Sequence, residues 1–230
     1  MSIKLEQVIP WGRCLDEYIG MFDLKLADRE LAILDCAGGP ASFNVEMTRQ
    51  GNKVISCDPV YQFSAVEIGD RIQATYQTVI DGVTANLDDF VWTNIASPAQ
   101  LGEVRMAAMQ QFLADLPLGI EQGRYVTAQL PFLPFDNGQF DLALCSHFLF
   151  AYSHLFSVEF HIAAITEMCR VAREVRVFPL LQSFSSEVSE CLEPTIQELK
   201  KTGFSVEIQQ VAYEFQKGGN KMLRVTGLHL

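Results

Sequence analysis

Short apolar segments alternate with amphipathic segments along the chain, and this alternation predicts an α/β fold. The apolar segments are rich in branched residues and predict strands at residues 31–36, 53–58, 123–129, 140–146 and 173–180. Continuous apolar runs of this length are typical of strands buried on both faces, as in a parallel sheet covered by helices. The amphipathic segments predict crossover helices at residues 42–50, at about 157–172, and from near Pro194 to Gly203.

The C-terminal part of the chain has a different pattern. Residues 204–215 and 221–228 read as two strands on either side of the glycine-containing segment QKGGN. This spacing predicts an antiparallel hairpin closed by a tight turn. We therefore expect residues 1–230 to form a single domain, with a mostly parallel sheet that ends in an antiparallel hairpin.

Residues 63–122 are longer than a minimal crossover between parallel strands, which needs about 10–12 residues. They predict a helical insertion, whose clearest helix has Ser97 as N-cap, Pro98 at its first position and Gln100 completing a capping box. The apolar stripe of this helix consists of Leu101, Val104, Ala108, Phe112 and Leu113. An insertion after the second strand lies beside the carboxyl ends of the sheet, where ligands bind in open α/β folds. We expect a lid or a wall of the substrate site, the alternative being helices that only extend the core.

The charge balance narrows the classes of partner. The chain has 17 Lys and Arg residues against 28 Asp and Glu residues, a formal net charge of −11. A surface this negative repels phosphate backbones, so we expect no nucleic-acid partner. No apolar run reaches the roughly 18 residues of a membrane span, and the first ten residues lack the apolar core of a signal peptide, so we expect a cytoplasmic protein with no membrane partner. The six cysteines are scattered without a CxxC pair and no histidines or carboxylates have ligand spacing, so we expect no disulfide framework and no metal.

The turn after the first predicted strand carries the first sign of chemistry. In LDCAGGPASF, residues 34–43, Gly38 and Gly39 lie between Ala37 and Ala41. Small residues let a ligand approach the backbone, and the next helix offers its N-terminal N–H groups. The segment contains neither the G-x-G-x-x-G dinucleotide fingerprint nor the Gly-Lys-Ser/Thr end of a P-loop. It therefore favours a nucleotide ligand that has no pyrophosphate to hold.

Asp58, at the end of the second predicted strand, follows Asp35 by 23 residues. An acidic side chain at this place can accept hydrogen bonds from both hydroxyls of a ribose. An aspartate before a proline is often only a loop residue, so Asp58 alone would say little. Together with the turn, it predicts a ligand with an adenosine group and free ribose hydroxyls.

These motifs resemble those of class I S-adenosylmethionine-dependent methyltransferases. Residues 33–41 are similar to the first motif of that family, V-L-D-x-G-x-G-x-G, with Gly39 as the middle glycine and with Ala37 and Ala41 in place of the other two. Asp58 corresponds to the acidic residue of the second motif. The segment LPFDNGQFDLALCSHFLFAYSHL, which begins at residue 133, is similar to the pattern L-P-F-x-D/N-G-x-F-D-L-V-x-C/S of many small-molecule methyltransferases.

The resemblance implies a Rossmann-like, doubly wound sheet with the closing antiparallel hairpin. It also implies an N-terminal helical cap over the cofactor, residues 1–30, and S-adenosylmethionine as that cofactor. The whole chain further resembles an uncharacterised bacterial subgroup that carries the segments W-G-R-x-x-x-E-Y and R-E-V-R-x-F-P-L, present here from Trp11 and Arg173.

The resemblance also implies a set of site residues. Gln129 stands where the family usually has an aspartate that contacts adenine, Leu130 would offer its backbone N–H to the base, and Ser146 would face the methionine part. The implied cofactor-binding residues are Asp35, Ala37, Gly38, Gly39, Asp58, Pro59, Gln129, Leu130 and Ser146.

His147 is the candidate catalytic base, because it directly follows the fourth predicted strand. Methyl transfer from a sulfonium depends mainly on bringing donor and acceptor together, and a base helps when the acceptor is a hydroxyl or a protonated amine. The alternative is that His147 only packs against its neighbours.

The expected acceptor is a small molecule, and the NPPY signature of enzymes that methylate nucleic-acid amines is missing. Aromatic residues that could lie near the pocket favour an apolar or aromatic acceptor: Tyr18, Phe22, Tyr61, Tyr76, Phe90, Trp92, Phe148, Phe150, Tyr152 and Phe156. Two alternatives to a methyltransferase stay open. One is a non-catalytic protein or regulator of the same fold that binds the cofactor, and the other, which the missing glycine disfavours, is a nicotinamide oxidoreductase.

Overall fold

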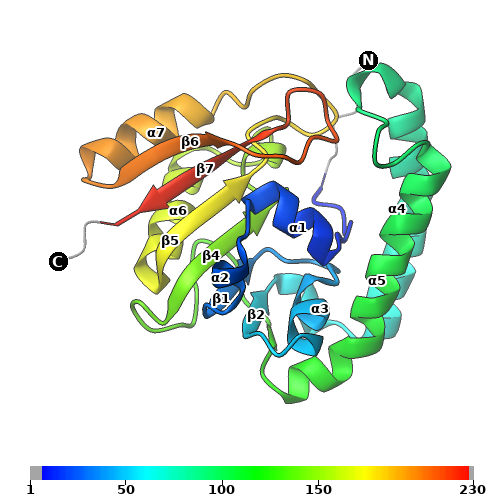
Figure 1. The fold of residues 1–230 in the computed structure, drawn as a ribbon, viewed down its shortest axis with the longest axis horizontal. Helices are drawn as coiled ribbons and strands as arrows, with labels where there is room; N and C mark the ends of the chain where they lie inside the picture. Colours follow the sequence, from blue (N-terminus) through cyan, green and yellow to red (C-terminus); the bar gives the residue numbers. More distant parts are fainter. Residues whose placement is uncertain (1–6, 228–230) are drawn as a thin grey trace.

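A seven-stranded sheet runs through the molecule in the order β3-β2-β1-β4-β5-β7-β6 (Figure 1). Strands β1 to β5 pair in parallel, whereas β7 is antiparallel to both β5 and β6. This is the α/β fold of class I methyltransferases, and the predicted fold class is confirmed. The computed structural model describes residues 7–227, and its strands are β1 Ile33–Cys36, β2 Val54–Cys57, β3 Tyr125–Val126, β4 Phe140–Ser146, β5 Ala172–Phe178, β6 Ser205–Gln210 and β7 Lys221–Thr226.

Helices cover both faces of the sheet, and a long pair of helices, α4 and α5, lies along one side of the molecule (Figure 1). The α-helices are α1 Leu15–Phe22, α2 Leu26–Arg29, α3 Phe43–Arg49, α4 Ala65–Ala85, α5 Pro98–Glu121, α6 Val158–Val171 and α7 Leu192–Lys201. The 3-10 helices are η1 Pro59–Gln62, η2 Leu87–Asp89 and η3 Phe150–Tyr152. Helices α3 and α6 lie within their predicted ranges, and α7 begins two residues before Pro194.

The two faces of the sheet have separate apolar clusters, because successive residues of a strand point to opposite faces. Leu34 and Ala143 belong to the cluster formed with α6 and α7. Their neighbours Ile33 and Leu142 belong to the cluster formed with α1 and α3. Both faces of β1 and β4 are thus buried, which explains their continuous apolar sequences.

The last two strands form the predicted antiparallel hairpin, and the Gly219 N–H donates to the Gln216 carbonyl at 2.8 Å in a tight turn between them. The predicted extent of the first strand, residues 204–215, is wrong. Strand β6 ends at Gln210 and β7 begins at Lys221, so residues 211–220 form a longer loop. The loop leaves the sheet because the Phe215 ring packs on Phe90 and Trp92, with ring centroids 5.0 and 5.5 Å away. These contacts fasten the loop to the insertion.

The insertion, residues 63–122, consists mainly of α4 and α5, which pack side by side (Figure 1). Ser97 caps α5 as predicted, since its hydroxyl accepts a hydrogen bond from the Gln100 N–H at 3.2 Å. The Gln100 side chain accepts from the Ala96 N–H, one residue earlier than the predicted capping box required. Within residues 7–227, no helix is both long enough and apolar enough to span a bilayer.

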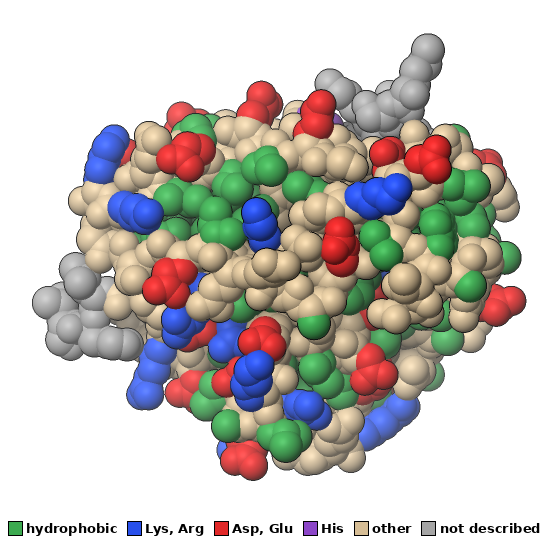
Figure 2. All heavy atoms as spheres, turned by 45° about the horizontal axis from the view of Figure 1, so that its top comes forward, with side chains coloured by type: hydrophobic (Ala, Val, Ile, Leu, Met, Phe, Trp, Pro, Cys, Tyr) green, Lys and Arg blue, Asp and Glu red, His purple; other side chains and the backbone are tan. Residues whose placement is uncertain are grey.

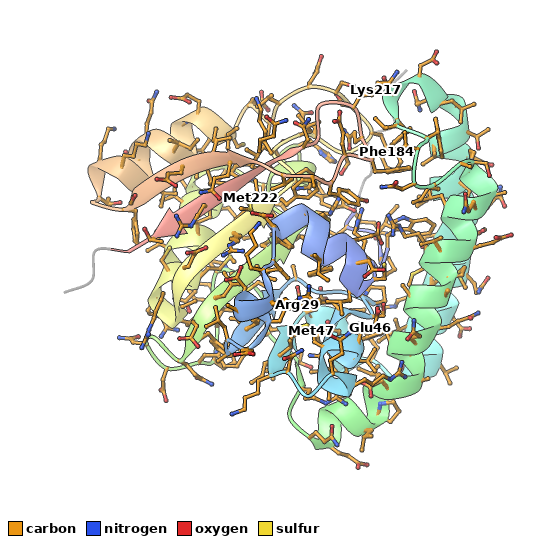
Figure 3. All side chains as sticks on the ribbon, viewed as in Figure 1. Arg29, Glu46, Met47, Phe184, Lys217 and Met222 are labelled. Atoms are coloured by element: carbon orange, nitrogen blue, oxygen red, sulfur yellow. The ribbon has the colours of Figure 1, made fainter. Side chains whose placement is uncertain are left out.

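The predicted N-terminal cap is described from residue 7 onward, and residues 1–6 lie outside the described part. Residues 7–14 have no helix, and α1 then packs against α3 and the sheet. Glu46 of α3, labelled in Figure 3, accepts a hydrogen bond from the Leu15 N–H at 3.1 Å. Gly12 passes so close to the turn after β1 that a Cβ would stand 2.0 Å from the Pro40 carbonyl oxygen. The N-terminal segment is therefore fixed against that turn.

Candidate active site

A cavity of about 900 Å³ opens at the carboxyl ends of β1, β2 and β4. Strands β1 and β4 flank the point where the strand order reverses, which is where ligands bind in open α/β sheets. The walls come from the turns after these strands, the N-terminal segment, the α4–α5 pair and the loop 211–220. Phe184, labelled in Figure 3, is also in the lining and packs against residues of the insertion. Nine of the ten predicted site residues line the cavity, and Asp35 does not.

The turn after β1 passes through two left-handed residues, Ala37 with φ 53° and Gly39 with φ 52°. A Cβ on Gly38 would stand 2.3 Å from Asp35 Oδ2, so only glycine fits at this position. A Cβ on Gly39 would meet only Asp58 Oδ2, 4.0 Å away. The turn therefore presents bare main chain to the cavity.

Asp58 is held in a fixed orientation by two backbone N–H groups. Its Oδ2 accepts from Gly39 at 3.0 Å and its Oδ1 accepts from Val60 at 2.8 Å. Burial raises the pKa of Asp58 to about 6, although these hydrogen bonds act in the opposite direction. Above that pH the side chain is a carboxylate, and each oxygen can accept another hydrogen bond.

Asp35 lies beneath the turn rather than in the cavity wall. Only 1% exposed, it accepts hydrogen bonds from the Tyr18 hydroxyl at 3.1 Å and the Ser56 hydroxyl at 3.0 Å. Burial raises the pKa of Asp35 to about 7. Asp35 thus joins α1 and β2 to the base of the turn, and its position does not support the predicted direct contact with a cofactor.

Gln129 and Leu130 line the cavity beyond the end of β3. The Gln129 carbonyl accepts a hydrogen bond from the Phe132 N–H at 2.9 Å, and the Gln129 side chain is exposed. Its amide offers a donor and an acceptor but no charge. Pro59 reaches the same cavity as the first residue of η1.

His147 and Ser146 lie side by side at the end of β4. The Ser146 hydroxyl oxygen and His147 Nδ1 form a hydrogen bond of 3.0 Å. His147 has a left-handed backbone, with φ 52°, and its N–H donates to the Phe178 carbonyl at 2.6 Å. Burial, together with the positive charges of Arg13 and Arg105, holds the pKa of His147 well below its usual range. The imidazole is therefore neutral near pH 7, with one nitrogen lone pair, and it is a weaker base than an ordinary histidine.

Half of the aromatic residues expected near the pocket do line the cavity: Tyr18, Phe90, Phe148, Tyr152 and Phe156. The others are outside its lining. Tyr61, for example, packs against Phe112 and Tyr125 of the insertion side. Seven further aromatic residues that sequence reasoning did not place near the pocket also line the cavity: Trp11, Phe63, Phe160, Phe178, Phe184, Tyr213 and Phe215.

Two arginines that sequence reasoning also missed, Arg13 and Arg105, line the cavity beside His147. Arg105 is 1% exposed and forms an ion pair with Glu17, whose other oxygen accepts from the Tyr213 hydroxyl at 2.9 Å. Although burial opposes ionisation, the Arg105 guanidinium lowers the pKa of Glu17 to about 2. The site therefore contains a buried, charged network that no single motif predicts.

A signal for this network is nevertheless present in the sequence. Arg105 stands four residues after Leu101 and three before Ala108, so it is a charged residue on the apolar stripe of a predicted helix. Arg13 and Glu17 belong to the W-G-R-x-x-x-E-Y segment that carries part of the resemblance. Within residues 7–227, no cluster of three side chains suits a metal ion.

Comparison with known sequences adds one relative. An uncharacterised protein of the archaeon Methanocaldococcus jannaschii is 29% identical over 224 residues, 96% of this chain and 97% of the relative. Because this relative is archaeal, the expected restriction to a bacterial subgroup is not supported. No protein-family model matches the chain.

Solved structures with a similar fold include several methyltransferases. Magnesium protoporphyrin IX methyltransferase from Synechocystis, with bound S-adenosylmethionine, is 15% identical with a TM-score of 0.42, and the match covers 86% of this chain and 70% of that one. A TehB-like S-adenosylmethionine-dependent methyltransferase from Corynebacterium glutamicum is 14% identical with a TM-score of 0.44, covering 86% and 80%. The PH0226 protein from Pyrococcus horikoshii is 11% identical with a TM-score of 0.47, covering 92% and 90%. At these identities the likeness concerns the fold alone.

Proposed function

We propose that this protein is an S-adenosylmethionine-dependent methyltransferase that acts on a small molecule. The observation that carries the proposal is the hydrogen bond by which the Gly39 N–H fixes the Asp58 carboxylate at the cavity wall. It combines bare main chain with an oriented carboxylate, and an adenosine group with free ribose hydroxyls needs both. When bound, the cofactor supplies a methyl group carried on a positively charged sulfonium.

The lining residues fit this cofactor. Asp58 accepts hydrogen bonds from the ribose hydroxyls, and Gly38 and Gly39 let the cofactor approach the main chain. The Gln129 amide and the Leu130 N–H contact the edge of the adenine. All five residues line one cavity, which supports their assignment to one ligand.

His147 is the proposed general base. Its neutral imidazole accepts a proton from an acceptor hydroxyl or amine as the new bond to carbon forms. The hydrogen bond between Ser146 and Nδ1 orients the ring, and when Nδ1–H donates to the Ser146 hydroxyl oxygen, Nε2 has the free lone pair that the base needs. We assign Ser146 to the amino-acid part of the cofactor. The competing interpretation is packing, since the His147 ring also contacts Phe178 with centroids 5.4 Å apart.

The insertion supplies the proposed substrate wall. Val79, Val83 and Leu101 of its helices line the cavity, and Phe90 lines it from the connection between them. An apolar wall of this kind suits an acceptor with an apolar or aromatic part. The α4–α5 pair also extends the core around Phe112, so the two interpretations of the insertion are compatible.

Thermal unfolding with candidate ligands tests the cofactor assignment. S-adenosylmethionine and S-adenosylhomocysteine should each raise the melting temperature, because a ligand that binds only the folded state stabilises it by mass action. NAD and NADP should leave the melting temperature unchanged. A shift with NAD, and none with either sulfur compound, would instead identify a nicotinamide protein.

A non-catalytic protein that binds the cofactor is the second candidate. It is favoured by Ala37, which holds a left-handed conformation that costs about 1–2 kcal/mol in place of the motif glycine, and by the uncharged Gln129. Turnover separates the two candidates. An enzyme releases S-adenosylhomocysteine faster when small-molecule extracts are added, whereas a binding protein shows no acceleration with any extract.

A further inference from the structure

The charged network beside His147 contains one more positive than negative group. Arg13 and Arg105 are both cations of the cavity lining, and the carboxylate that interacts with both of them is Glu17. Glu17 is not in the lining, and its oxygens are occupied by Arg105, the Tyr213 hydroxyl and the Cys14 N–H. Glu17 is therefore outside the cavity wall, whereas Arg13 and Arg105 form part of that wall.

Arg13 is the less compensated of the two arginines. Among the described residues it forms no ion pair, and its Nη1 donates to the Trp11 carbonyl at 3.1 Å. The buried Nε atoms of Arg13 and of Arg105 have no hydrogen-bond partner within residues 7–227. A buried N–H donor without a partner is costly, and the donors of a guanidinium suit a planar anion.

The positive charge of Arg13 and Arg105 contrasts with the acidic character of the whole chain. The chain has a net charge of −11, and the Asp and Glu side chains are spread over the face shown in Figure 2. An excess of positive charge inside so acidic a protein favours a negatively charged ligand at that place.

The cofactor as a whole adds no negative charge to the cavity. S-adenosylmethionine carries a sulfonium and an ammonium group against one carboxylate, so it brings a net positive charge into the cavity. An anionic acceptor can supply the negative charge that the network lacks, and the carboxylate of the cofactor is the competing source. One uncompensated cation matches a monoanionic carboxylate better than a doubly charged phosphate.

The cavity continues from the arginines toward an apolar region. Leu101 lies one helical turn before Arg105 on α5, and it belongs to the cluster of Phe90, with which Phe184 and Phe215 pack. An acceptor that reaches from Arg105 into this cluster has an acidic group at one end and an apolar body at the other.

We propose that the methyl acceptor is an organic acid, whose carboxylate binds Arg13 and Arg105 and whose apolar body packs among Phe90, Phe184 and Phe215. This inference rests on the proposed methyltransferase function and adds the chemical class of its substrate.

Matched acids and amides test the inference. The protein is saturated with S-adenosylhomocysteine and titrated calorimetrically with benzoate, 3-phenylpropionate and octanoate, and then with the amide of each. We expect at least one acid to bind at least tenfold more tightly than its amide. Equal affinity of each acid and its amide, or binding of neither, would overturn the inference.

Two variants locate the effect. Arg13→Gln removes an arginine that has no ion pair, so the melting temperature should be at least that of the wild type, while the preference for the acid is lost. Arg71→Gln is the matched control, because Arg71 also lines the cavity but is exposed and lies over the Phe63 ring. It should keep the preference.

The carboxylate that binds Arg13 could instead be that of the cofactor. One outcome is that the Arg13→Gln variant binds S-adenosylhomocysteine more weakly than the wild type does, but binds 5′-methylthioadenosine, which lacks the amino-acid group, equally well. In that case Arg13 binds the cofactor, and the inference is wrong. Unchanged affinity for both compounds supports it. If the wild-type protein binds no S-adenosylhomocysteine at all, the proposed function fails, and the inference fails with it.

Discussion

The two faces of the sheet differ in the side chains that they bury. On the side of α6 and α7, helix residues such as Ile165 and Leu199 join β-strand residues in a largely apolar cluster. On the side of α1, an ion pair between Glu17 and Arg105 is buried next to the cavity. Burying charge does not stabilise a fold better than apolar packing does.

The difference separates stability from function within one domain. Apolar packing under α6 and α7 contributes through area removed from water and carries no chemistry. The charged side has groups with strongly shifted pKa values, which cluster at functional sites in many proteins. We therefore expect substitutions on the two sides to affect different measurements.

His147→Ala should have the largest effect on activity. Loss of a general base lowers turnover by about 10²–10⁴-fold, whereas the affinity for S-adenosylhomocysteine should be unchanged because we assign His147 to the acceptor and not to the cofactor. Turnover is measured as release of S-adenosylhomocysteine with an accepted substrate.

The matched control for this variant is His161→Gln on the opposite side. His161 is fully buried on α6 and stacks on Phe150, outside the cavity lining. It should keep normal turnover even if its melting temperature falls. Full activity of the His147→Ala variant would show that His147 only packs against its neighbours.

Glu17→Ala should cause the largest loss of stability. It leaves Arg105 buried without a counter-ion, and breaking a buried pair in this way costs about 3–5 kcal/mol. The free energy of unfolding is measured with urea. The double variant Glu17→Gln, Arg105→Gln should recover part of the loss, and failure to recover any of it would mean that packing rather than charge is responsible.

Leu199→Ala should cost about 2–5 kcal/mol of unfolding free energy, because Leu199 on α7 is fully buried. Its affinity for S-adenosylhomocysteine should stay at the wild-type value, since no α7 residue lines the cavity. Urea unfolding and calorimetry on the same preparation check both expectations. A large loss of affinity would show that the two sides are coupled.

The same division explains how far the sequence could be interpreted. The continuous apolar runs of β1 and β4, the cap at Ser97 and the small residues of the turn are local features. The pattern of residues therefore predicts the strands, the insertion and the main lining of the cavity. Residues 211–215 are predicted as strand but form a loop, because their path depends on the contact of Phe215 with Phe90. These two residues are far apart in the sequence.

The charged network escaped prediction for a related reason. Arg13, Arg105 and Tyr213 come from the N-terminal segment, the insertion and the last loop, and only the folded chain brings them to Glu17. Asp35 is the opposite case, a motif residue that the structure does not place in the cavity lining. It belongs to a recognisable motif, but its carboxylate turns to Tyr18 and Ser56 below the turn.

Asp58→Ala should weaken the binding of S-adenosylhomocysteine by about 1.5–3 kcal/mol, the usual contribution of hydrogen bonds to a charged group. The substitution also releases the Gly39 N–H, which Asp58 now holds at 3.0 Å. Calorimetric titration gives the dissociation constant. Asp88→Ala, an exposed change outside the cavity, is the control and should bind normally. An unchanged dissociation constant for Asp58→Ala would show that Asp58 does not bind the ribose.

The pH dependence of cofactor binding should be the smallest effect, and its direction follows from the same carboxylate. Burial raises the pKa of Asp58 to about 6, so the group is partly protonated, and a poorer hydrogen-bond acceptor, below that pH. Affinity for S-adenosylhomocysteine should therefore rise about fourfold between roughly pH 5.5 and 7.5. Asp35, with its pKa raised to about 7, titrates in the same range beneath the turn. Asp58→Asn should flatten the profile and Asp35→Asn should preserve it, whereas the reverse result would assign the titration to the base of the turn instead of the cavity wall.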